Sequence, residues 1–453
     1  MIADLKPYPA YKESGSKWLG VVPVSWEVRN LRTLISKRAE RNRADLPLLS
    51  VAREKGVFVR SLTDANENHN VIPEDLSNYK MARAGNLVIN KMKAWQGSMG
   101  IAPCDGIVSP AYFVFDLRIA NRAFGQKLLR SKPYVAHFGQ ASDGVRVGQW
   151  DLSIPGMRQI PMLVPPADEQ AAIVRFLDWA NGRLDRAIRA KRKVIALLNE
   201  QKQAIIHRAV TRGLDPNVPL KPSGIPWLGD IPQHWEVRRL KFVASCIVDC
   251  LHATPRYSDS GSHPAIRTAD VSPGVVHLAR AKRISLAEYV RWTARMEPRE
   301  GDILYSREGE RFGIAACVPA GVKLCISQRM MVFRIGDDDH SAFVMRLLNS
   351  QSTYNQALQD VMGATAPHVN ISTIRNYVLA LPKKQEQEAI VAYVESEIGP
   401  IDVTISRLER EIELLREYRT RLVADVVTGK LDVRAAAAKL PEEAVHDTVE
   451  DNT

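Results

Sequence analysis

The stretch SKWLGVVPVSWEVRNL, residues 16–31, occurs a second time as IPWLGDIPQHWEVRRL, residues 225–240. Its Trp, Leu, Gly, Pro and Glu residues return at a constant separation of 209 positions, so that Trp26 corresponds to Trp235. A repeat with a period above 200 residues indicates a duplicated domain pair and not a solenoid. The sequence therefore predicts two homologous halves, each introduced by this lead-in.

A second repeated block closes each half. VPPADEQAAIVRFLDWANGRLDRAI begins at Val164 and LPKKQEQEAIVAYVESEIGPIDVTI at Leu381, 217 positions later. The blocks end in TRGLD (211–215) and TGKLD (428–432). Between lead-in and tail the halves diverge, and their patterns predict a mixed α/β fold. Strands are expected at 85–90, 112–117, 301–306 and 330–335, and helices at 122–131 and 341–359.

Apolar residues in both tails recur at intervals of three, four and seven, which is typical of helices with one narrow apolar seam. Gly182 and Gly399-Pro400 fall at equivalent places and predict a break, followed in each tail by a helix of about 28 residues. Each helix could pack on its own globular part, or the two could pair as an antiparallel coiled coil. The second arrangement is favoured and would hold the globular parts apart by about one turn of B-DNA, roughly 34–36 Å. The residues expected to pair are Leu184, Ile188, Ile195, Leu198, Ile205, Ile401, Ile405, Ile412, Leu415 and Leu422.

The expected organisation is a tandem of two mixed α/β domains separated by the two long helices. In order, we expect an N-terminal lead-in (1–30), a first α/β domain (31–158), a first helical region (159–215), a linker with the second lead-in (216–239), a second α/β domain (240–375), a second helical region (376–432) and a disordered tail (433–453).

Composition narrows the class of protein. The chain has 453 residues, 45% of them hydrophobic and 25% charged, as in ordinary soluble domains. A net charge of +11 favours a polyanionic partner such as nucleic acid. With no secretory signal and no apolar run that could span a bilayer, the expected location is the cytoplasm. Five cysteines without a C-x-x-C pair suit free thiols, and their spacing matches no common zinc site.

Catalytic signatures are missing from the sequence. Leu431 stands where a phosphate-binding loop needs Ser or Thr, and VPPADEQ lacks both the amide or acid and the aromatic residue of an amino-methyltransferase motif. Gly309 to Gly313 lacks the third glycine of a dinucleotide-binding turn. We therefore expect no catalytic residue and no bound metal, and the balance favours a binding module.

The divergent parts contain side chains suited to reading DNA. Arg, Lys, Asn and Gln match the donors and acceptors of base edges, and other cations would hold phosphates. For any single residue a solvated surface position remains the simpler interpretation, whereas the set favours DNA. The candidates are Arg53, Lys55, Arg60, Lys91, Lys93, Trp95, Gln96 and Arg146 in the first half, and Thr254, Arg256, Tyr257, Arg267, Arg307, Arg311, Gln328 and Arg329 in the second.

The lead-in SGIPWLGDIPQHWEVRRLK, the helix starts PPADEQAAIVRFLD and KQEQEAIVAYVE, and the ending TGKLDVR together resemble the specificity subunit of type I restriction-modification systems, from about Tyr11 to Arg434. The resemblance implies two target recognition domains, each binding half of an asymmetric bipartite DNA site, and helices that set the spacer length. It implies docking of two methyltransferase subunits that methylate adenine N6 with S-adenosylmethionine, joined by restriction subunits that translocate DNA with ATP and Mg²⁺. This chain would carry no cofactor of its own.

Two other functions remain open. The chain could be the DNA-recognition scaffold of a different phage-defence complex that uses the same domains. It could also be a stand-alone methyltransferase-nuclease with degenerate motifs.

Overall fold

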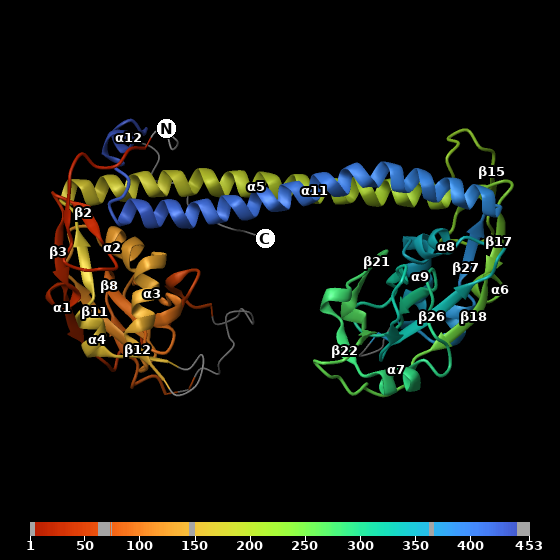
Figure 1. Cartoon of the computed structure of the whole chain (residues 1–453), viewed down its shortest axis with the longest axis horizontal. Coiled ribbons are helices and arrows are strands. Elements are labelled where there is room, and N and C mark those ends of the chain that lie inside the picture. The colour runs from red at the N-terminus through yellow and green to blue at the C-terminus, as the bar shows by residue number, and fades with distance from the viewer. Residues whose placement is uncertain (1–4, 62–72, 74, 145–149, 362–366, 442–453) are drawn as a thin grey trace. The chain divides into compact units, whose positions relative to one another are not determined.

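The computed structural model describes residues 5–61, 73, 75–144, 150–361 and 367–441. The chain divides into two compact units (Figure 1). The first unit combines residues up to Arg192 with those from Glu409 onward, and the second unit is Lys193–Leu408. Each unit therefore contains one mixed α/β globular part together with a segment of each long helix.

The same four-stranded antiparallel sheet forms the centre of both globular parts. Its order is β4-β11-β8-β9 in the first unit and β18-β26-β23-β24 in the second. The strands and helices predicted within the two globular parts are confirmed, with one difference: the single helix expected at 341–359 is two helices that meet at Asn349-Ser350. Ser350 ends the first by donating its hydroxyl to the Leu347 carbonyl and caps the second by accepting from the Thr353 amide.

The two halves begin with the same types of element, three strands and a short helix before the central sheet, but their later elements differ in part. The first unit contains β1 (Tyr11–Glu13), β2 (Val21–Pro23), β3 (Glu27–Asn30), α1 (Leu31–Leu34), β4 (Ile35–Arg38), β5 (Leu49–Ala52), β6 (Gly56–Val59), β7 (Lys80–Ala82), β8 (Asn86–Asn90), η1 (Ala94–Gln96), β9 (Met99–Ile101), β10 (Gly106–Val108), β11 (Tyr112–Leu117), α2 (Arg122–Leu129), α3 (Lys132–Gln140), β12 (Ser142–Asp143), β13 (Asp151–Leu152), α4 (Ile154–Arg158), β14 (Pro161–Val164) and α12 (Arg434–Ala438). The second contains β15 (Leu220–Pro222), β16 (Asp230–Pro232), β17 (Glu236–Arg239), α6 (Leu240–Val243), β18 (Ala244–Asp249), β19 (His263–Ile266), η2 (Thr268–Asp270), β20 (Val271–Ser272), β21 (Val275–Val276), η3 (Leu278–Arg280), β22 (Lys282–Ile284), α7 (Leu286–Trp292), β23 (Ile303–Ser306), β24 (Ala315–Cys317), β25 (Cys325–Ile326), β26 (Met330–Ile335), α8 (Ser341–Leu348), α9 (Gln351–Val361), α10 (Ile371–Arg375) and β27 (Val378–Leu381).

The repeated lead-in is fastened to the repeated helix start in each unit. Trp26 is fully buried, and its indole Nε1 donates to Glu169 Oε1 at 2.8 Å. The second copy repeats the contact, with Trp235 Nε1 3.0 Å from Glu386 Oε1. Because Trp and Glu recur together, each lead-in is held at the point where its recognition domain enters the long helix.

The buried glutamine of each helix start serves as a backbone clamp. Gln170 donates to the Pro165 carbonyl and accepts from the Asn121 amide, at 2.8 and 2.9 Å. Gln387 makes the equivalent bonds to the Pro382 carbonyl and the His340 amide, at 2.9 and 2.8 Å. The Glu and Gln of the P-x-x-x-E-Q pattern thus have a structural role, because their side chains hold the junction between the last strand of each domain and the long helix.

The predicted breaks in the long helices are wrong. α5 (Ala167–Arg212) and α11 (Lys384–Val427) are continuous over 46 and 44 residues, with Gly182, Gly399 and Pro400 inside them. A glycine costs a helix only about 1 kcal/mol and an interior proline about 3 kcal/mol. Packing along an apolar seam outweighs these local costs.

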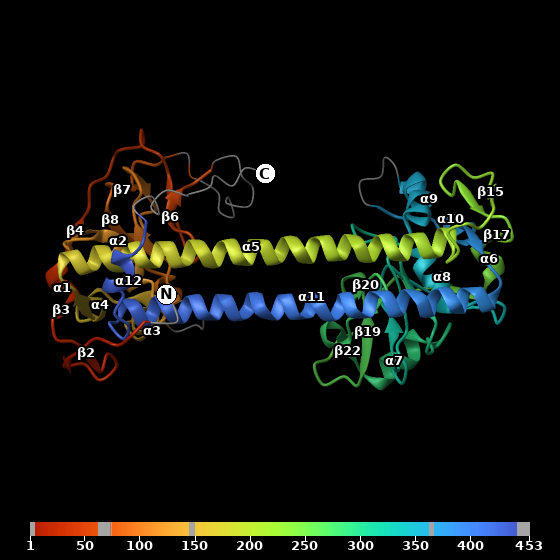
Figure 2. The same cartoon turned by 90° about the horizontal axis from the view of Figure 1, so that it is seen from above.

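The antiparallel pairing of α5 and α11 is confirmed, and Figure 2 shows the two helices side by side. In the first unit Leu184, Ile188, Ile412 and Leu422 are buried and Leu415 is half-buried. In the second unit Ile195, Leu198, Ile205, Ile401 and Ile405 are all half-buried.

Charged residues complete the seam. Lys191 and Lys202 continue its four-three spacing and reach Glu411 and Asp402 on the opposite helix, each at 2.5 Å, while Arg419 pairs with Asp185. Polar residues on such a seam fix register, because a slipped pairing would leave them opposite apolar side chains.

The expected disorder of the C-terminal tail is wrong for its described part. Arg434–Ala438 forms α12, and Ala437 and Leu440 are buried against the first unit. Asp432 pairs with Lys6 through a β-bridge, and the Arg434 guanidinium lies 5.2 Å from the Tyr8 ring centre. The segment is ordered because N- and C-terminal residues share one core; residues 442–453 lie outside the described part.

Candidate nucleic-acid interface

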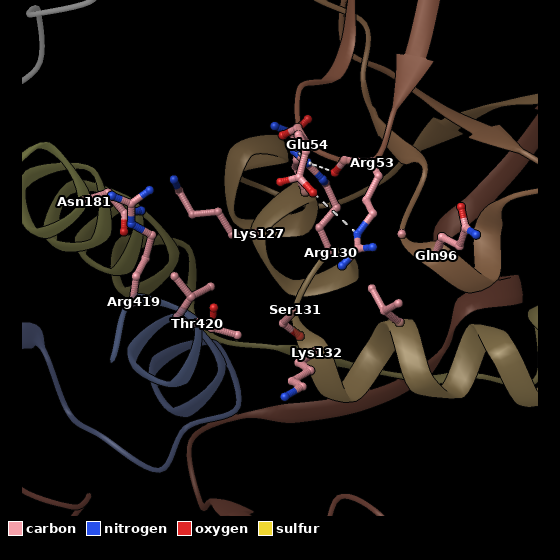
Figure 3. Close-up of a pocket in the computed structure, with 14 residues that line it drawn as sticks. Arg53, Glu54, Gln96, Lys127, Arg130, Ser131, Lys132, Asn181, Arg419 and Thr420 are labelled. Carbon is pink, nitrogen blue, oxygen red and sulfur yellow. Dashed lines mark hydrogen bonds and ion pairs between the residues drawn. The ribbon is translucent and has the colours of Figure 1, made fainter. Parts of the chain in front are cut away.

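Two of the predicted DNA-contacting segments of the first unit lie next to each other. Arg53 and Lys55 occupy the turn between β5 and β6, whereas Gln96 ends η1. Arg53 and Gln96 line one pocket, and the Arg53 side chain is 70% exposed (Figure 3). Lys55 Nζ lies 5.0 Å from the centre of the Phe58 ring. The turn therefore presents cations at the surface.

Arg130, which the sequence did not single out, holds this turn in place. Its Nη2 donates to the backbone carbonyls of Arg53 and Glu54, each at 2.7 Å. Gly56 follows with φ +74°, and a Cβ there would stand 2.9 Å from Arg130 Nη1. Only the tertiary contact reveals this role, because Arg130 is 77 positions from Arg53 and belongs to no repeated motif.

Lys91 and Trp95 have partners within the first unit. Lys91 Nζ lies 2.8 Å from Asp151 Oδ2, and the rings of Trp95 and Trp150 are 5.1 Å apart at 53°. Lys93 is exposed and Arg60 half-buried. Arg146 lies outside the described residues.

In the second unit, Arg307 is the centre of a buried charge network. It is 3% exposed, and its Nη2 lies 3.1 Å from Asp249 Oδ2 and 2.9 Å from Glu308 Oε1. His368 Nδ1 reaches the same Glu308 oxygen at 3.1 Å. Asp249, Glu308 and His368 were missed because they lie on separate strands and loops. The Arg307 guanidinium faces the protein, so its evident role is to hold neighbouring loops.

This network supports an exposed turn at Gln328-Arg329. Both residues are exposed, and Arg329 has a φ of +70°, which a non-glycine residue adopts only when its surroundings hold it. The Arg307 amide donates to the Arg329 carbonyl at 3.1 Å, and Arg329 Nε lies 3.9 Å from Glu308 Oε2. Arg329 is 59% exposed and remains available to an external anion.

The other candidates of the second unit differ in availability. Arg267 makes a bidentate pair with buried Asp270, at 2.8 Å for both bonds, and these bonds raise the pKa of the guanidinium. Arg311 donates to the Val271 carbonyl at 2.6 Å, and the Tyr257 hydroxyl lies 3.2 Å from Ser327 Oγ. Thr254 and Arg256 are exposed. Arg267 thus serves the fold, while Thr254, Arg256, Gln328 and Arg329 form the more accessible set.

The described residues contain no cluster of metal ligands, and two of the cysteine thiols have a raised pKa. Within these ranges no three His, Cys, Asp or Glu side chains are grouped as a metal site requires. Burial raises the pKa of Cys317 to about 11 and of Cys325 to about 12, so both thiols stay protonated at neutral pH. In the same part of the chain, no helix has the length and apolar character to span a bilayer.

The two α/β parts have the same sheet order, carry exposed cationic turns that suit a polyanion such as DNA, and join the pair of long helices. Residues 232–414 match the family described as type I restriction modification DNA specificity domain. This match lies within the second half of the chain and agrees with the resemblance to type I specificity subunits seen in the sequence.

Curated relatives extend over both halves. The chain is similar to the specificity subunit of the type I restriction enzyme MjaVIII from Methanocaldococcus jannaschii, 22% identical over 61% of this chain and 63% of that protein. It is also 22% identical to the EcoKI specificity subunit of Escherichia coli, over 81% of this chain and 76% of that one. A putative MjaX specificity subunit is 20% identical over 94% and 98% of the two chains. The match thus spans less than two thirds of the first relative but nearly all of the third.

The fold has a counterpart among solved structures. A chain from a structure of a type I restriction-modification system superimposes with a TM-score of 0.65 at 16% identity, covering 90% of this chain and 99% of that chain. At this identity the likeness establishes the fold alone.

Proposed function

We propose that this chain selects the DNA target of a type I restriction-modification complex. Each recognition domain reads one half of a bipartite, asymmetric site, and the paired helices set the spacer. The observation that carries the proposal is the duplication itself: one scaffold occurs twice, whereas the exposed residues on it differ, as two unlike half-sites require. The matched family is a DNA specificity domain, which supports the same function.

In this proposal, partner subunits in the cytoplasm carry out methylation and restriction. Two methyltransferase subunits dock on the helical frame and methylate adenine N6 with S-adenosylmethionine, and restriction subunits use ATP and Mg²⁺. The specificity subunit contributes DNA recognition and assembly, with no catalytic residue. The accessible cationic turns support the role in DNA binding. The side-chain amides of Gln170 and Gln387 donate hydrogen bonds to backbone carbonyls, so these recurring groups of the repeat have a structural role.

Modified-base sequencing of the host genome, with and without this gene, tests the function. We expect N6-methyladenine to be lost at one bipartite motif when the gene is deleted. Complementation with Gln328→Ala and Arg329→Ala should change the second half-site alone, because these residues belong to the second unit. Unchanged methylation after deletion would contradict the proposal.

The rival functions predict different results. A stand-alone methyltransferase-nuclease would methylate DNA as purified chain supplied with S-adenosylmethionine. A scaffold of another defence complex would co-purify without methyltransferase subunits and would leave genomic methylation unaffected.

A further inference from the structure

The first unit contains a pocket of about 660 Å³ bordered by cationic side chains (Figure 3). Its wall is formed by the β5–β6 turn, by α2 and α3, and by neighbouring segments of α5 and α11. The cations on the wall are Arg53, Lys127, Arg130, Lys132 and Arg419.

Only part of this positive charge is compensated. Arg53 Nε lies 3.5 Å from Oε1 of Glu54, which also lines the pocket, Lys127 lies 2.5 Å from Asp178, and Arg419 pairs with Asp185. Arg130 uses its guanidinium on two backbone carbonyls. Across the described residues, no carboxylate lies within ion-pair distance of Arg130 or Lys132. The pocket therefore has a surplus of positive charge that comes from Arg130 and Lys132, the two cations for which the structure describes no carboxylate partner.

The start of α3 adds donors at the same place. Ser131 precedes this helix but donates its hydroxyl to the Leu128 carbonyl at 2.7 Å, so α3 begins without a side-chain cap. Pro133 has no N–H, so the unpaired amides of this turn are those of Lys132 and Tyr134, which attract anions together with the helix dipole. The Nε of Arg419, buried beside the pocket, also has no hydrogen-bond partner among the described atoms.

The second unit provides an internal comparison. Its own pocket of about 710 Å³ lies at the equivalent junction and keeps the two scaffold ion pairs, as Lys202 with Asp402 and Arg346 with Glu395. The extra cations are missing, because Asn349 stands in place of Arg130 and Gln351 in place of Lys132.

The helix cap differs as well, because Ser350 caps α9 by accepting from the Thr353 amide at 3.4 Å. The second unit thus has the same fold without cations at the positions of Arg130 and Lys132. The fold therefore does not require these two cations, and a ligand that needs them would account for their presence.

We propose that the pocket of the first unit binds a phosphate group. Arg53 and Gln96 at its wall also belong to the candidate DNA interface, which favours a backbone phosphate beside the half-site read by the first recognition domain. This source rests on the proposed function, whereas binding of a free phosphate compound would need only the pocket. Lys132 and the first turn of α3 hold the oxyanion, and Arg130 positions the turn that carries Arg53.

Two binding measurements on the full chain test this site. In the first, the chain reconstituted with its methyltransferase subunits binds a fluorescent duplex over a range of salt concentrations. Lys132→Gln should weaken cognate and non-cognate duplexes alike and reduce the slope of log K against log salt by roughly one, as loss of one phosphate contact predicts. Lys132→Arg should restore both values. Lys17→Gln, the same charge change at an exposed lysine of the lead-in, is the matched control.

In the second, the chain alone is titrated with inorganic triphosphate by calorimetry. One site per chain, lost in Lys132→Gln, would identify a free phosphate compound as the ligand, and the thermal unfolding midpoint of each variant checks folding. Equal effects of Lys17→Gln and Lys132→Gln on DNA, together with no triphosphate site, would overturn the proposal. If wild-type complex bound no bipartite duplex, the proposed function would fail, while the triphosphate titration would still decide the site.

Discussion

Arg307 holds two carboxylates at the surface of the second unit's sheet and is itself almost fully buried. Arg307→Ala leaves Asp249 and Glu308 side by side without their cation, so we expect a loss of about 3 kcal/mol in the free energy of unfolding. Urea unfolding followed by circular dichroism measures it. Arg256→Ala, which removes an exposed guanidinium, should cost less than about 0.5 kcal/mol. Equal losses would show that the network contributes little.

His137 links stability to pH. Its ring stacks on Trp18 of the lead-in at 4.3 Å, and burial lowers its pKa below the ordinary value. The unfolded chain therefore binds more protons than the folded one near pH 6.5, and stability must fall as the pH drops through that range toward the folded pKa. His137→Gln should flatten this decline between about pH 7 and 5 in thermal unfolding scans. If the unfolding midpoints of the variant and the wild type fell in parallel over this pH range, His137 would not be the source of the decline.

At the residue scale, the sequence predicted which apolar residues anchor the lead-ins better than it predicted which cations have ion-pair partners. Trp26 and Trp235 could be recognised as apolar anchors because they recur. Whether Lys91, Arg267 or Arg307 faces solvent could not be predicted, because the carboxylates that engage them lie elsewhere in the chain. Exposure of a cation depends on tertiary partners, which leave no local signal.

At the element scale, the periodicity of the tails predicted both long helices and their pairing. The expected breaks failed because a local cost was weighed without the seam that offsets it. The seam also explains three charges that look out of place: Lys191, Lys202 and Arg419 each meet a carboxylate on the facing helix. Central strands were predictable as well, since they are buried apolar runs such as β8.

Pro400 makes the cost of an interior proline measurable. It lies within α11 at an exposed position, and it has no N–H to donate to the Ser396 carbonyl. Pro400→Ala should therefore raise the free energy of unfolding by about 1–3 kcal/mol. Pro133→Ala is the matched control, because Pro133 stands in the first turn of α3, where proline is favourable, and should bring no gain. If both variants gained free energy of unfolding, the effect would have to come from the unfolded chain and not from the interior position of Pro400.

At the scale of the whole molecule, duplication was the most informative feature of the sequence. It predicted two like folds with unlike surfaces, and both copies have the same sheet order. The accessible turns could not be ranked in advance, because Arg130 and Glu308 support them from distant positions. The specificity of each half therefore depends on exposed side chains that a shared, buried framework holds in position.

The paired helices should act as a ruler for the length of the DNA spacer. α5 and α11 pass uninterrupted through the boundary between the units, at residues 192 and 408. One duplicated heptad inserted there into both helices keeps the seam in phase and adds about 10 Å at 1.5 Å per residue. Methylation mapping should then show a spacer longer by about three base pairs, since a base pair rises about 3.4 Å.

A four-residue insertion should give about two base pairs, from roughly 6 Å of added helix. It also shifts the phase of the seam and should cost more stability. A heptad inserted into α5 alone is the control, because it removes the pairing of Lys202 with Asp402 or of Arg419 with Asp185, and methylation should be lost. If both matched insertions left the spacer unchanged, the helices would serve assembly alone, and the half-site separation would have to be set by the methyltransferase subunits.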